Sequence, residues 1–227
     1  MTTATATPAH GPASEPWSAD PYARALARGR GPLYLRCSDG RRLPLDVARW
    51  CAGPNPADRT VLARCAGAVL DVGCGPGRMV AALARQGRPA LGIDTAPAAV
   101  ARTRGAGGAA LLRSVFQDLP REGWWGSVLL LDGNAGIGGD PAALLRRLYQ
   151  LTAPGGLLLA EAAAGPPDAD ERLTARLDDG DGPAGPPFPW ARTGHQALRA
   201  HAERAGWHTA GQWTVQDRPF LALRRPA

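Results

Sequence analysis

The sequence contains no lysine, and all 26 of its basic residues are arginine. A Schiff base to a substrate, attachment of pyridoxal phosphate and a Walker A phosphate loop each require a lysine side chain, so these chemistries are excluded. The net charge is +6 and the pI about 9.9, but the arginines are spread along the chain without a basic run. This spacing predicts a solvated surface rather than a groove for nucleic acid.

Cysteine is also scarce, with four residues at positions 37, 51, 65 and 74. They form no C-x-x-C pair and have no histidine partner at zinc spacing, so we expect neither a metal site nor a disulfide framework. No segment approaches the length of a transmembrane helix, and the first residues are rich in Thr, Ala and Pro rather than basic and then apolar. We therefore expect a cytoplasmic protein without a membrane partner.

A chain of 227 residues with 44% hydrophobic content can bury one good core. Residues 1–18 are a small-residue, proline-containing stretch, which we predict to be a disordered tail. Residues 19–57 are predicted to form an N-terminal cap, and residues 58–227 the main domain. The cap is expected to contain helices at 20–28 and 46–51 and, between them, a hairpin from Leu33 to Leu45 that turns at Asp39 and Gly40.

The most informative stretch runs from Val69 to Arg78 and reads V-L-D-V-G-C-G-P-G-R. Its first residues are typical of a buried parallel strand, and 79–86 is predicted to form a helix. Between them, three glycines leave the backbone free of side chains: Gly73, Gly75 and Gly77. A ligand can therefore lie against bare backbone amides at a helix N-terminus, although tight packing of the turn would also favour glycine.

A second apolar run, from Pro89 to Ile93, ends at Asp94, about twenty residues after the first glycine. The dinucleotide fold places there a carboxylate that binds a pair of ribose hydroxyls. The glycine spacing is G-x-G-x-G, with Arg78 where the third glycine of G-x-G-x-x-G would fall. This spacing is a poor fit for a pyrophosphate and argues against NAD or FAD.

The rest of the chain alternates between helical and strand patterns, which is typical of an α/β fold. After the helix capped by Asp58 and the two strands described above, the expected elements are a helix at 98–104, strands at 109–115 and from 127, a helix at 142–151 capped by Asp140, a strand at 156–160, a helix at 196–205 and a closing hairpin of strands at 209–215 and 219–223. Residues 165–194 are a long Pro/Gly/Asp-rich connection in which we expect a short helix at 168–177. Because this connection contains F-P-W-A-R, we interpret it as a lid.

These motifs resemble those of the class I S-adenosylmethionine-dependent methyltransferases, whose first motif is typically two hydrophobic residues followed by D-x-G-x-G-x-G. The resemblance covers roughly residues 58–225. It implies a Rossmann-like three-layer sandwich around a mostly parallel seven-stranded sheet of order 3-2-1-4-5-7-6, with strand 7 antiparallel. It also implies S-adenosylmethionine as cofactor and S-adenosylhomocysteine as its product.

The resemblance assigns roles to residues at the strand ends. The glycines would pass under the methionyl and ribose groups, with Asp71 near the amino group and Asp94 on the ribose hydroxyls. Val115, beside Phe116, takes the place of an acid that contacts adenine in many such enzymes. Asp132 and Asn134 lie in the loop that borders the methyl group, where turn chemistry would equally favour them. The cofactor-site candidates are Asp71, Gly73, Gly75, Gly77, Asp94, Thr95, Val115, Phe116, Asp132 and Asn134.

The favoured function is transfer of a methyl group to an oxygen, nitrogen or carbon nucleophile of a small molecule, by a monomer or homodimer. A dedicated base is optional for this reaction; the candidates are His195 and Tyr34. Trp190 and Arg192 are predicted to bind the acceptor, in a pocket made by the Leu33 to Leu45 hairpin, the Asp132 to Gly139 loop and the Phe188 to His195 lid.

Two alternatives stay open. The first is an NAD(P)-dependent oxidoreductase with a Rossmann-like fold, and the second is a non-catalytic regulatory protein that binds S-adenosylmethionine. Methylation of nucleic acid is disfavoured, because the loop after the fourth strand reads D-G-N-A instead of the N-P-P-Y or D-P-P-Y of many nucleobase methyltransferases.

Overall fold

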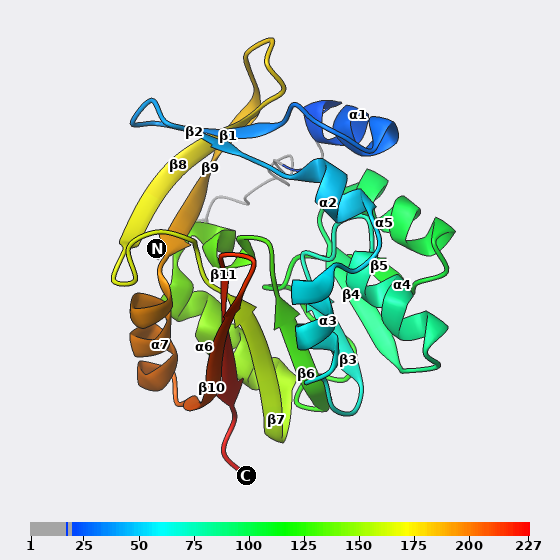
Figure 1. Ribbon diagram of the computed structural model, residues 1–227, viewed down its shortest axis with the longest axis vertical. Helices are drawn as coiled ribbons and strands as arrows, with labels where there is room; N and C mark the ends of the chain where they lie inside the picture. The colour runs from blue at the N-terminus through cyan, green and yellow to red at the C-terminus, as the bar shows by residue number, and fades with distance from the viewer. Residues whose placement is uncertain (1–16, 18–19) are drawn as a thin grey trace, which may run out of the picture.

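The computed structural model describes residue 17 and residues 20–227. Its centre is a seven-stranded sheet (Figure 1) that consists of β3 (Val69–Val72), β4 (Ala90–Asp94), β5 (Ala110–Leu112), β6 (Trp125–Leu130), β7 (Thr152–Glu161), β10 (His208–Val215) and β11 (Arg218–Arg224). The strands are ordered β10-β11-β7-β6-β3-β4-β5, and β11 is antiparallel to both of its neighbours. Numbered by their order in the main domain, these strands follow 3-2-1-4-5-7-6, which confirms the predicted fold class.

Helices cover both faces of this sheet (Figure 1). One face carries α3 (Pro56–Leu62), α4 (Arg78–Arg85) and α5 (Pro97–Gly105), and the other carries α6 (Pro141–Leu151) and α7 (His195–Arg204). Asp140 caps α6 as predicted, since its carboxylate accepts from the backbone of Ala142 and Ala143. The predicted cap of α3 was wrong: Asn55 is the N-cap, and Asp58 completes a capping box from the third helical position.

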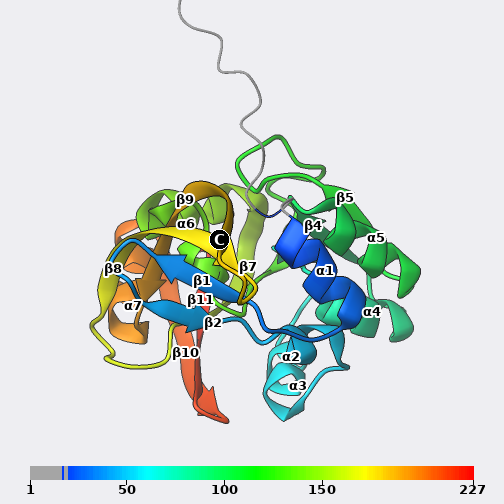
Figure 2. The same cartoon turned by 90° about the horizontal axis from the view of Figure 1, so that it is seen from above.

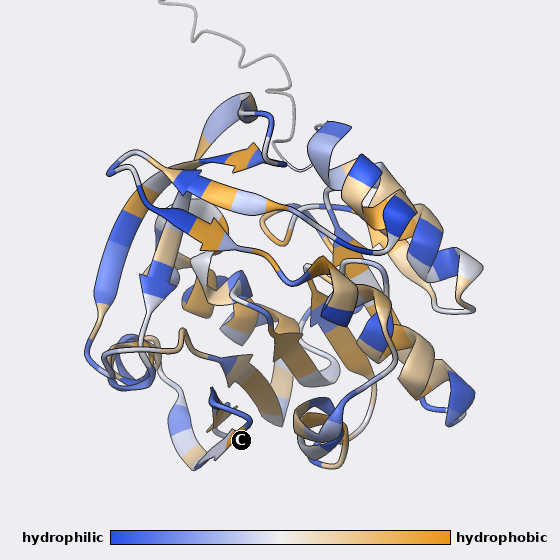
Figure 3. Ribbon diagram, turned by 45° about the horizontal axis from the view of Figure 1, so that its top comes forward, coloured by the Kyte–Doolittle hydropathy of each residue, from blue (hydrophilic) through white to orange (hydrophobic). Residues whose placement is uncertain are grey.

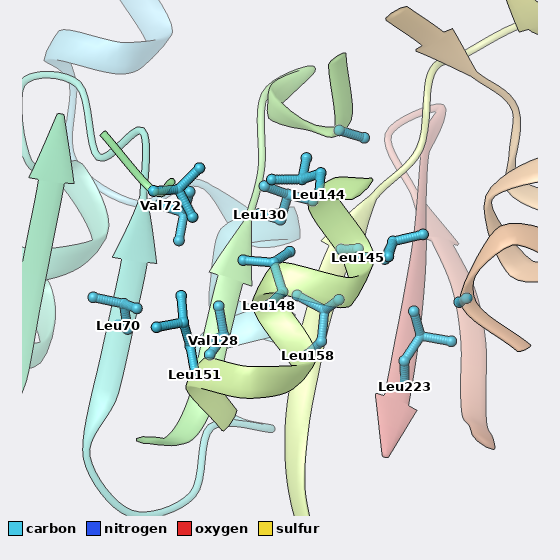
Figure 4. Packing of buried hydrophobic residues seen from close by; sticks show 14 of the residues in the cluster. Leu70, Val72, Val128, Leu130, Leu144, Leu145, Leu148, Leu151, Leu158 and Leu223 are labelled. Carbon is cyan, nitrogen blue, oxygen red and sulfur yellow. The ribbon is translucent and has the colours of Figure 1, made fainter. Parts of the chain in front are cut away.

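The core follows from the alternation of side chains along the central strands. Leu70 and Val72 pack toward α6, whereas Val69 faces α3 and α4 on the opposite side. Figure 4 shows leucines of α6 interlocking with alternate residues of β3, β6 and β7. Hydropathy follows the same arrangement, because the central strands are largely apolar and the helices carry hydrophilic bands (Figure 3). Among the described helices, none is both long and apolar enough to span a membrane.

A second sheet lies above the carboxyl ends of the central strands (Figures 1 and 2). The predicted N-terminal elements are present as α1 (Asp20–Arg28), β1 (Tyr34–Cys37), β2 (Arg42–Pro44) and α2 (Val47–Cys51). The sheet is ordered β2-β1-β8-β9, and its other two strands, β8 (Asp170–Asp178) and β9 (Pro183–Thr193), come from the connection after β7. The cap is therefore built from two segments that are distant in the sequence.

The short helix expected at 168–177 was wrong, because this segment forms strand β8. Leu173, Ala175 and Leu177 alternate along it and pack into the core shared with α1 and β1. Leu177 lies opposite Leu35 in an antiparallel ladder. This pairing buries the alternating side chains on one face, which a helix could not do with residues spaced by two.

The predicted disordered tail, residues 1–18, lies outside the described residues except for Trp17. Its ring contacts Tyr22 of α1 and Phe188 and Trp190 of β9. Trp17 is therefore part of the cap rather than of a tail.

Candidate functional site

A cavity of about 410 Å³ lies between the carboxyl ends of β3, β4 and β6 and the cap above them. This edge of an open α/β sheet is where such folds bind their ligands. Ten of the predicted site residues line the cavity, namely Asp71, Gly73, Gly75, Asp94, Thr95, Val115, Phe116, Asp132, Asn134 and Trp190. The structure thus brings together residues at the ends of β3, β4, β5 and β6 with Trp190 of β9 in the cap.

The turn between β3 and α4 presents bare backbone to the cavity. Gly73 and Gly75 have φ angles of +66° and +54°, in the left-handed region that disfavours other residues. A Cβ on Gly73 would lie 2.5 Å from Nδ2 of Asn134, so this glycine lets the next loop pack closely. The nearest atom to a Cβ on Gly75 is the Tyr22 hydroxyl at 3.6 Å. At Gly75 the turn therefore presents bare backbone to the cavity, with the Tyr22 hydroxyl of the cap nearby.

Gly77, predicted as a third cofactor residue, is not among the described residues that line the cavity. Its φ is +88°, and a Cβ there would lie 2.6 Å from the Thr103 hydroxyl of α5. The role that the structure gives Gly77 is close packing of the start of α4 against α5.

The carboxylate of Asp94 is held in a fixed orientation at the tip of β4. Its Oδ2 accepts a hydrogen bond from the Gly75 amide at 2.8 Å, and its Oδ1 accepts one from the Ala96 amide at 2.9 Å. The glycine turn and the acid of the next strand are thereby joined into one structural unit. Thr95 follows directly and lines the same end of the cavity.

Asp71 is the buried acid of the site, with 4% of its surface exposed. Burial raises the pKa of this carboxyl to about 7, while the nearby Arg78 acts in the opposite direction. Asp132 and Asp94 add to the increase through charge repulsion. A cation bound at this point would favour the ionised carboxylate.

Asp132 takes part in a buried ionic network rather than facing the cavity with a free carboxylate. Its oxygens pair with Arg78 of α4 at 2.6 Å and with Arg49 of α2 at 3.1 Å. Arg218 of β11 approaches the same carboxylate at 3.2 Å. Asp132 thus connects the cap, the glycine turn and the last strand.

The network continues into the interior through Asp58, which is fully buried. Asp58 pairs with Arg78 at 3.2 Å and with Arg218 at 2.9 Å, and Arg218 also binds both carboxylate oxygens of Glu161. Arg78 replaces a glycine in the sequence motif, and the structure shows what it does: its guanidinium joins α4 to α3 and to the loop after β6.

Asn134 begins the 3₁₀ segment η2 (Asn134–Gly139) and closes the site from the side of β6. Its Nδ2 donates to the carbonyls of Val72 and Gly73, both at 2.9 Å. These two bonds fix the orientation of the amide and leave Oδ1 as the acceptor of the side chain. A ligand group at this position must therefore carry a proton.

Aromatic rings of the cap form another wall of the cavity. Trp17 lies at its centre, with ring centroids 5.3 Å from Tyr22, 5.6 Å from Phe188 and 5.7 Å from Trp190. Trp50 extends the wall beyond Tyr22. Burial raises the pKa of the Tyr22 hydroxyl well above its usual value, so this group stays neutral.

The glycines of η2 allow β9 to approach this wall closely. A Cβ on Gly136 would lie 2.6 Å from the indole of Trp190, and one on Gly139 would lie 2.7 Å from Pro189. In the sequence, the F-P-W-A-R motif was interpreted as part of a lid, and in the structure it lies on strand β9. Trp17, Tyr22 and Trp50 carried no comparable signal, because the position of the cap over the strand ends is set by tertiary packing.

Three predicted residues are not among the described residues that line the cavity: Tyr34, Arg192 and His195. Tyr34 lies beneath the guanidinium of Arg42 at 4.2 Å, and Arg192 donates to the carbonyl of Ala164 at 3.1 Å. His195 is the first residue of α7. Tyr34 and His195 belong to β1 and α7, which contribute no residue to the described lining, and Arg192 lies on β9 beyond Trp190, the last of its lining residues. The three are therefore withdrawn as candidates for catalysis and acceptor binding.

Comparison with known proteins is consistent with this geometry. Residues 57–207 match the family model described as a methyltransferase domain, and this match spans more than half of the chain. The protein therefore belongs to the methyltransferase domain family, which confirms the resemblance and favours it over the oxidoreductase alternative. No curated protein sequence matches the chain.

Several solved structures share the fold. An S-adenosylmethionine-dependent methyltransferase from Bacteroides fragilis, in complex with S-adenosylhomocysteine, is 22% identical with a TM-score of 0.76, over 94% of this chain and 96% of that one. A sugar N-methyltransferase from a Streptoalloteichus species is 20% identical with a TM-score of 0.53, over 74% and 85%. The 1,6-didemethyltoxoflavin N1-methyltransferase of Burkholderia thailandensis is 16% identical with a TM-score of 0.54, over 74% and 75%.

Proposed function

We propose that this protein uses S-adenosylmethionine to methylate an oxygen, nitrogen or carbon nucleophile of a small molecule. The observation that carries the proposal is the unit formed by the Gly73 to Gly75 turn and the Asp94 carboxylate at the base of the cavity beneath the cap. Among proteins of the same fold, one is described with S-adenosylhomocysteine bound, one with 1,6-didemethyltoxoflavin and S-adenosylhomocysteine bound, and one as a sugar N-methyltransferase. The cavity lies beneath the cap, which suits a small acceptor better than nucleic acid.

The residues present fit the cofactor. Asp94 is oriented to accept from two ribose hydroxyls, and the bare backbone at Gly75 allows the sugar to approach. At the other end of the turn, Asp71 and Oδ1 of Asn134 are both acceptors and suit the α-ammonium of the methionyl group. Val115 and Phe116 provide apolar surface for the adenine.

The cofactor supplies an already activated methyl group on a sulfonium, so the protein has mainly to position the acceptor in line with it. The described lining residues include no histidine, and Tyr22 is neutral because burial raises its pKa. We assign the rate enhancement to orientation and exclusion of water beneath the cap.

A matched pair of glycine variants tests the cofactor site. Gly75 and Gly87 both have positive φ, and a Cβ would clash at neither: its nearest neighbour at Gly75 is the Tyr22 hydroxyl at 3.6 Å, and at Gly87 no atom lies within 4 Å. Only Gly75 lines the cavity. Alanine costs about 1 to 2 kcal/mol of backbone strain at either position. Gly75→Ala is expected to weaken S-adenosylhomocysteine in a tryptophan fluorescence titration, and Gly87→Ala to leave its affinity unchanged. Equal affinities in the two folded variants would contradict the proposed site.

The non-catalytic alternative is tested by turnover. Methyl transfer from labelled S-adenosylmethionine to any member of a broad panel of small phenols, amines and sugars would exclude it. Binding of the cofactor with no transfer across the panel would favour a regulatory role instead.

A further inference from the structure

Three aromatic rings of the cap line one side of the cavity. Trp17, Phe188 and Trp190 contact one another at centroid distances between 5.6 and 6.1 Å, and the rings are tilted or perpendicular rather than stacked. Phe188 and Trp190 are each 6% exposed, so each meets the cavity through a small part of its ring. The close approach of Gly136 and Gly139 to β9 holds Trp190 in place.

This aromatic wall contains no charged residue among those described. The charged residues that line the rest of the cavity lie at its cofactor end, are paired with each other, or are exposed. Asp71 and Asp94 belong to the cofactor end, and Arg78 and Asp132 are paired with each other at 2.6 Å. Arg113 is exposed and follows β5, next to the Val115 that we assign to adenine. Among the described residues, the wall thus offers a charged acceptor no counter-ion, and burying an unpaired charge is costly.

We infer that the methyl acceptor is a planar, uncharged aromatic molecule that contacts Trp17, Phe188 and Trp190 in offset or edge-to-face geometry. This inference rests on the proposed methyltransferase function and specifies its substrate class. A contact between two aromatic rings is favourable beyond the burial of its surface, so we expect a flat ring to bind at least about fivefold to tenfold more tightly than a saturated one.

Three ligands with one carbon skeleton test this class. The protein is saturated with S-adenosylhomocysteine and titrated with 2-naphthol, decahydro-2-naphthol and naphthalene-2-sulfonate by calorimetry. We expect 2-naphthol to bind about tenfold tighter than either of the others. Equal or tighter binding of the saturated alcohol would overturn the aromatic ring contacts with the acceptor. Tighter binding of the sulfonate would overturn the inference that the acceptor is uncharged, and no binding of 2-naphthol would overturn both.

Variants then locate the binding surface. Trp190→Leu is expected to weaken 2-naphthol by about fivefold to tenfold, with the affinity for S-adenosylhomocysteine within about twofold of the wild type. Trp124→Leu is the control, because Trp124 is 73% exposed and lies outside the cavity lining. Phe188→Leu provides the same comparison if Trp190→Leu does not fold. Unchanged 2-naphthol affinity in the folded variant would overturn the proposed surface.

The proposed function and the proposed substrate class can be refuted separately. If the wild-type protein does not bind S-adenosylhomocysteine, the proposed function itself is wrong. If it binds S-adenosylhomocysteine but does not distinguish the three ligands, only the substrate class is wrong.

Discussion

The carboxyl of Asp71 makes cofactor affinity depend on pH in a way that can be worked out from the structure. Its pKa is raised to about 7 in the protein without cofactor, chiefly by burial. If the ionised carboxylate binds the α-ammonium of the cofactor, the protein must release the carboxyl proton first. The apparent affinity then falls as pH is lowered through the pKa, and is about 25-fold weaker at about pH 5.5 than at about pH 7.5.

The variant Asp71→Asn tests this reasoning because an amide does not titrate. We expect it to bind S-adenosylhomocysteine more weakly at about pH 7.5, by roughly 1.5 to 3 kcal/mol for the lost charge-assisted hydrogen bond. We also expect its affinity to be nearly constant between about pH 5.5 and about pH 7.5. The assay is isothermal titration calorimetry of both proteins across this range. A wild-type affinity that is flat with pH, or a variant that keeps the wild-type pH dependence, would refute the reasoning.

The same substitution has the opposite effect on stability without cofactor. The folded-state pKa of Asp71 lies above the unfolded value of 3.8, so the folded protein binds the proton more tightly. Ionisation of Asp71 therefore lowers the free energy of unfolding as pH rises from about 4 to about 7, by at most about 4 kcal/mol. Asp71→Asn should raise the thermal midpoint at about pH 8 and leave it unchanged below about pH 4.

Three further substitutions test other parts of the structure. Gly77→Ala is expected to lower the free energy of unfolding by about 2 kcal/mol or more in urea, through its positive φ and its contact with α5, while the folded variant keeps its affinity for S-adenosylhomocysteine; a large loss of affinity would return Gly77 to the cofactor site. Asp58→Ala removes one of the two carboxylates that the buried guanidinium groups of Arg78 and Arg218 share, the other being Asp132, and should cost about 3 to 5 kcal/mol in the same measurement; a cost below about 1 kcal/mol would show that the network contributes little. Trp17→Ala should slow turnover of an accepted substrate while cofactor affinity is retained, and unchanged turnover would remove this ring from the acceptor wall.

The main domain could be predicted because its signals are local. A strand such as Val69–Val72, a glycine turn and a helix are encoded by neighbouring residues, and Asp94 ends the next strand in the sequence. The order of the sheet is a non-local property, which the resemblance supplied and periodicity alone could not. The acid and the glycine turn of the candidate site were found for the same local reason.

The cap could be predicted only in part. The helix at 20–28 and the hairpin at Leu33 to Leu45 were found, but β8 was taken for a helix because its ladder partner lies far away in the sequence, with Tyr34 opposite Asp178. The same dependence on distant parts of the chain explains why Tyr34, Arg192 and His195 were wrongly chosen as site candidates. Whether Arg192 or Trp190 reaches the cavity depends on which part of β9 crosses the strand ends, which the sequence of the hairpin does not encode.

The central claim, that the glycine turn and Asp94 hold S-adenosylmethionine, is tested most directly by calorimetric titration of S-adenosylhomocysteine into the wild-type protein and into Asp94→Ala. The wild type should bind one equivalent, and the variant should bind more weakly by roughly 2 to 4 kcal/mol, about 30-fold to 800-fold, because two charge-assisted hydrogen bonds are lost. Absence of binding by the wild type, or equal affinity in a folded Asp94→Ala protein, would contradict the claim.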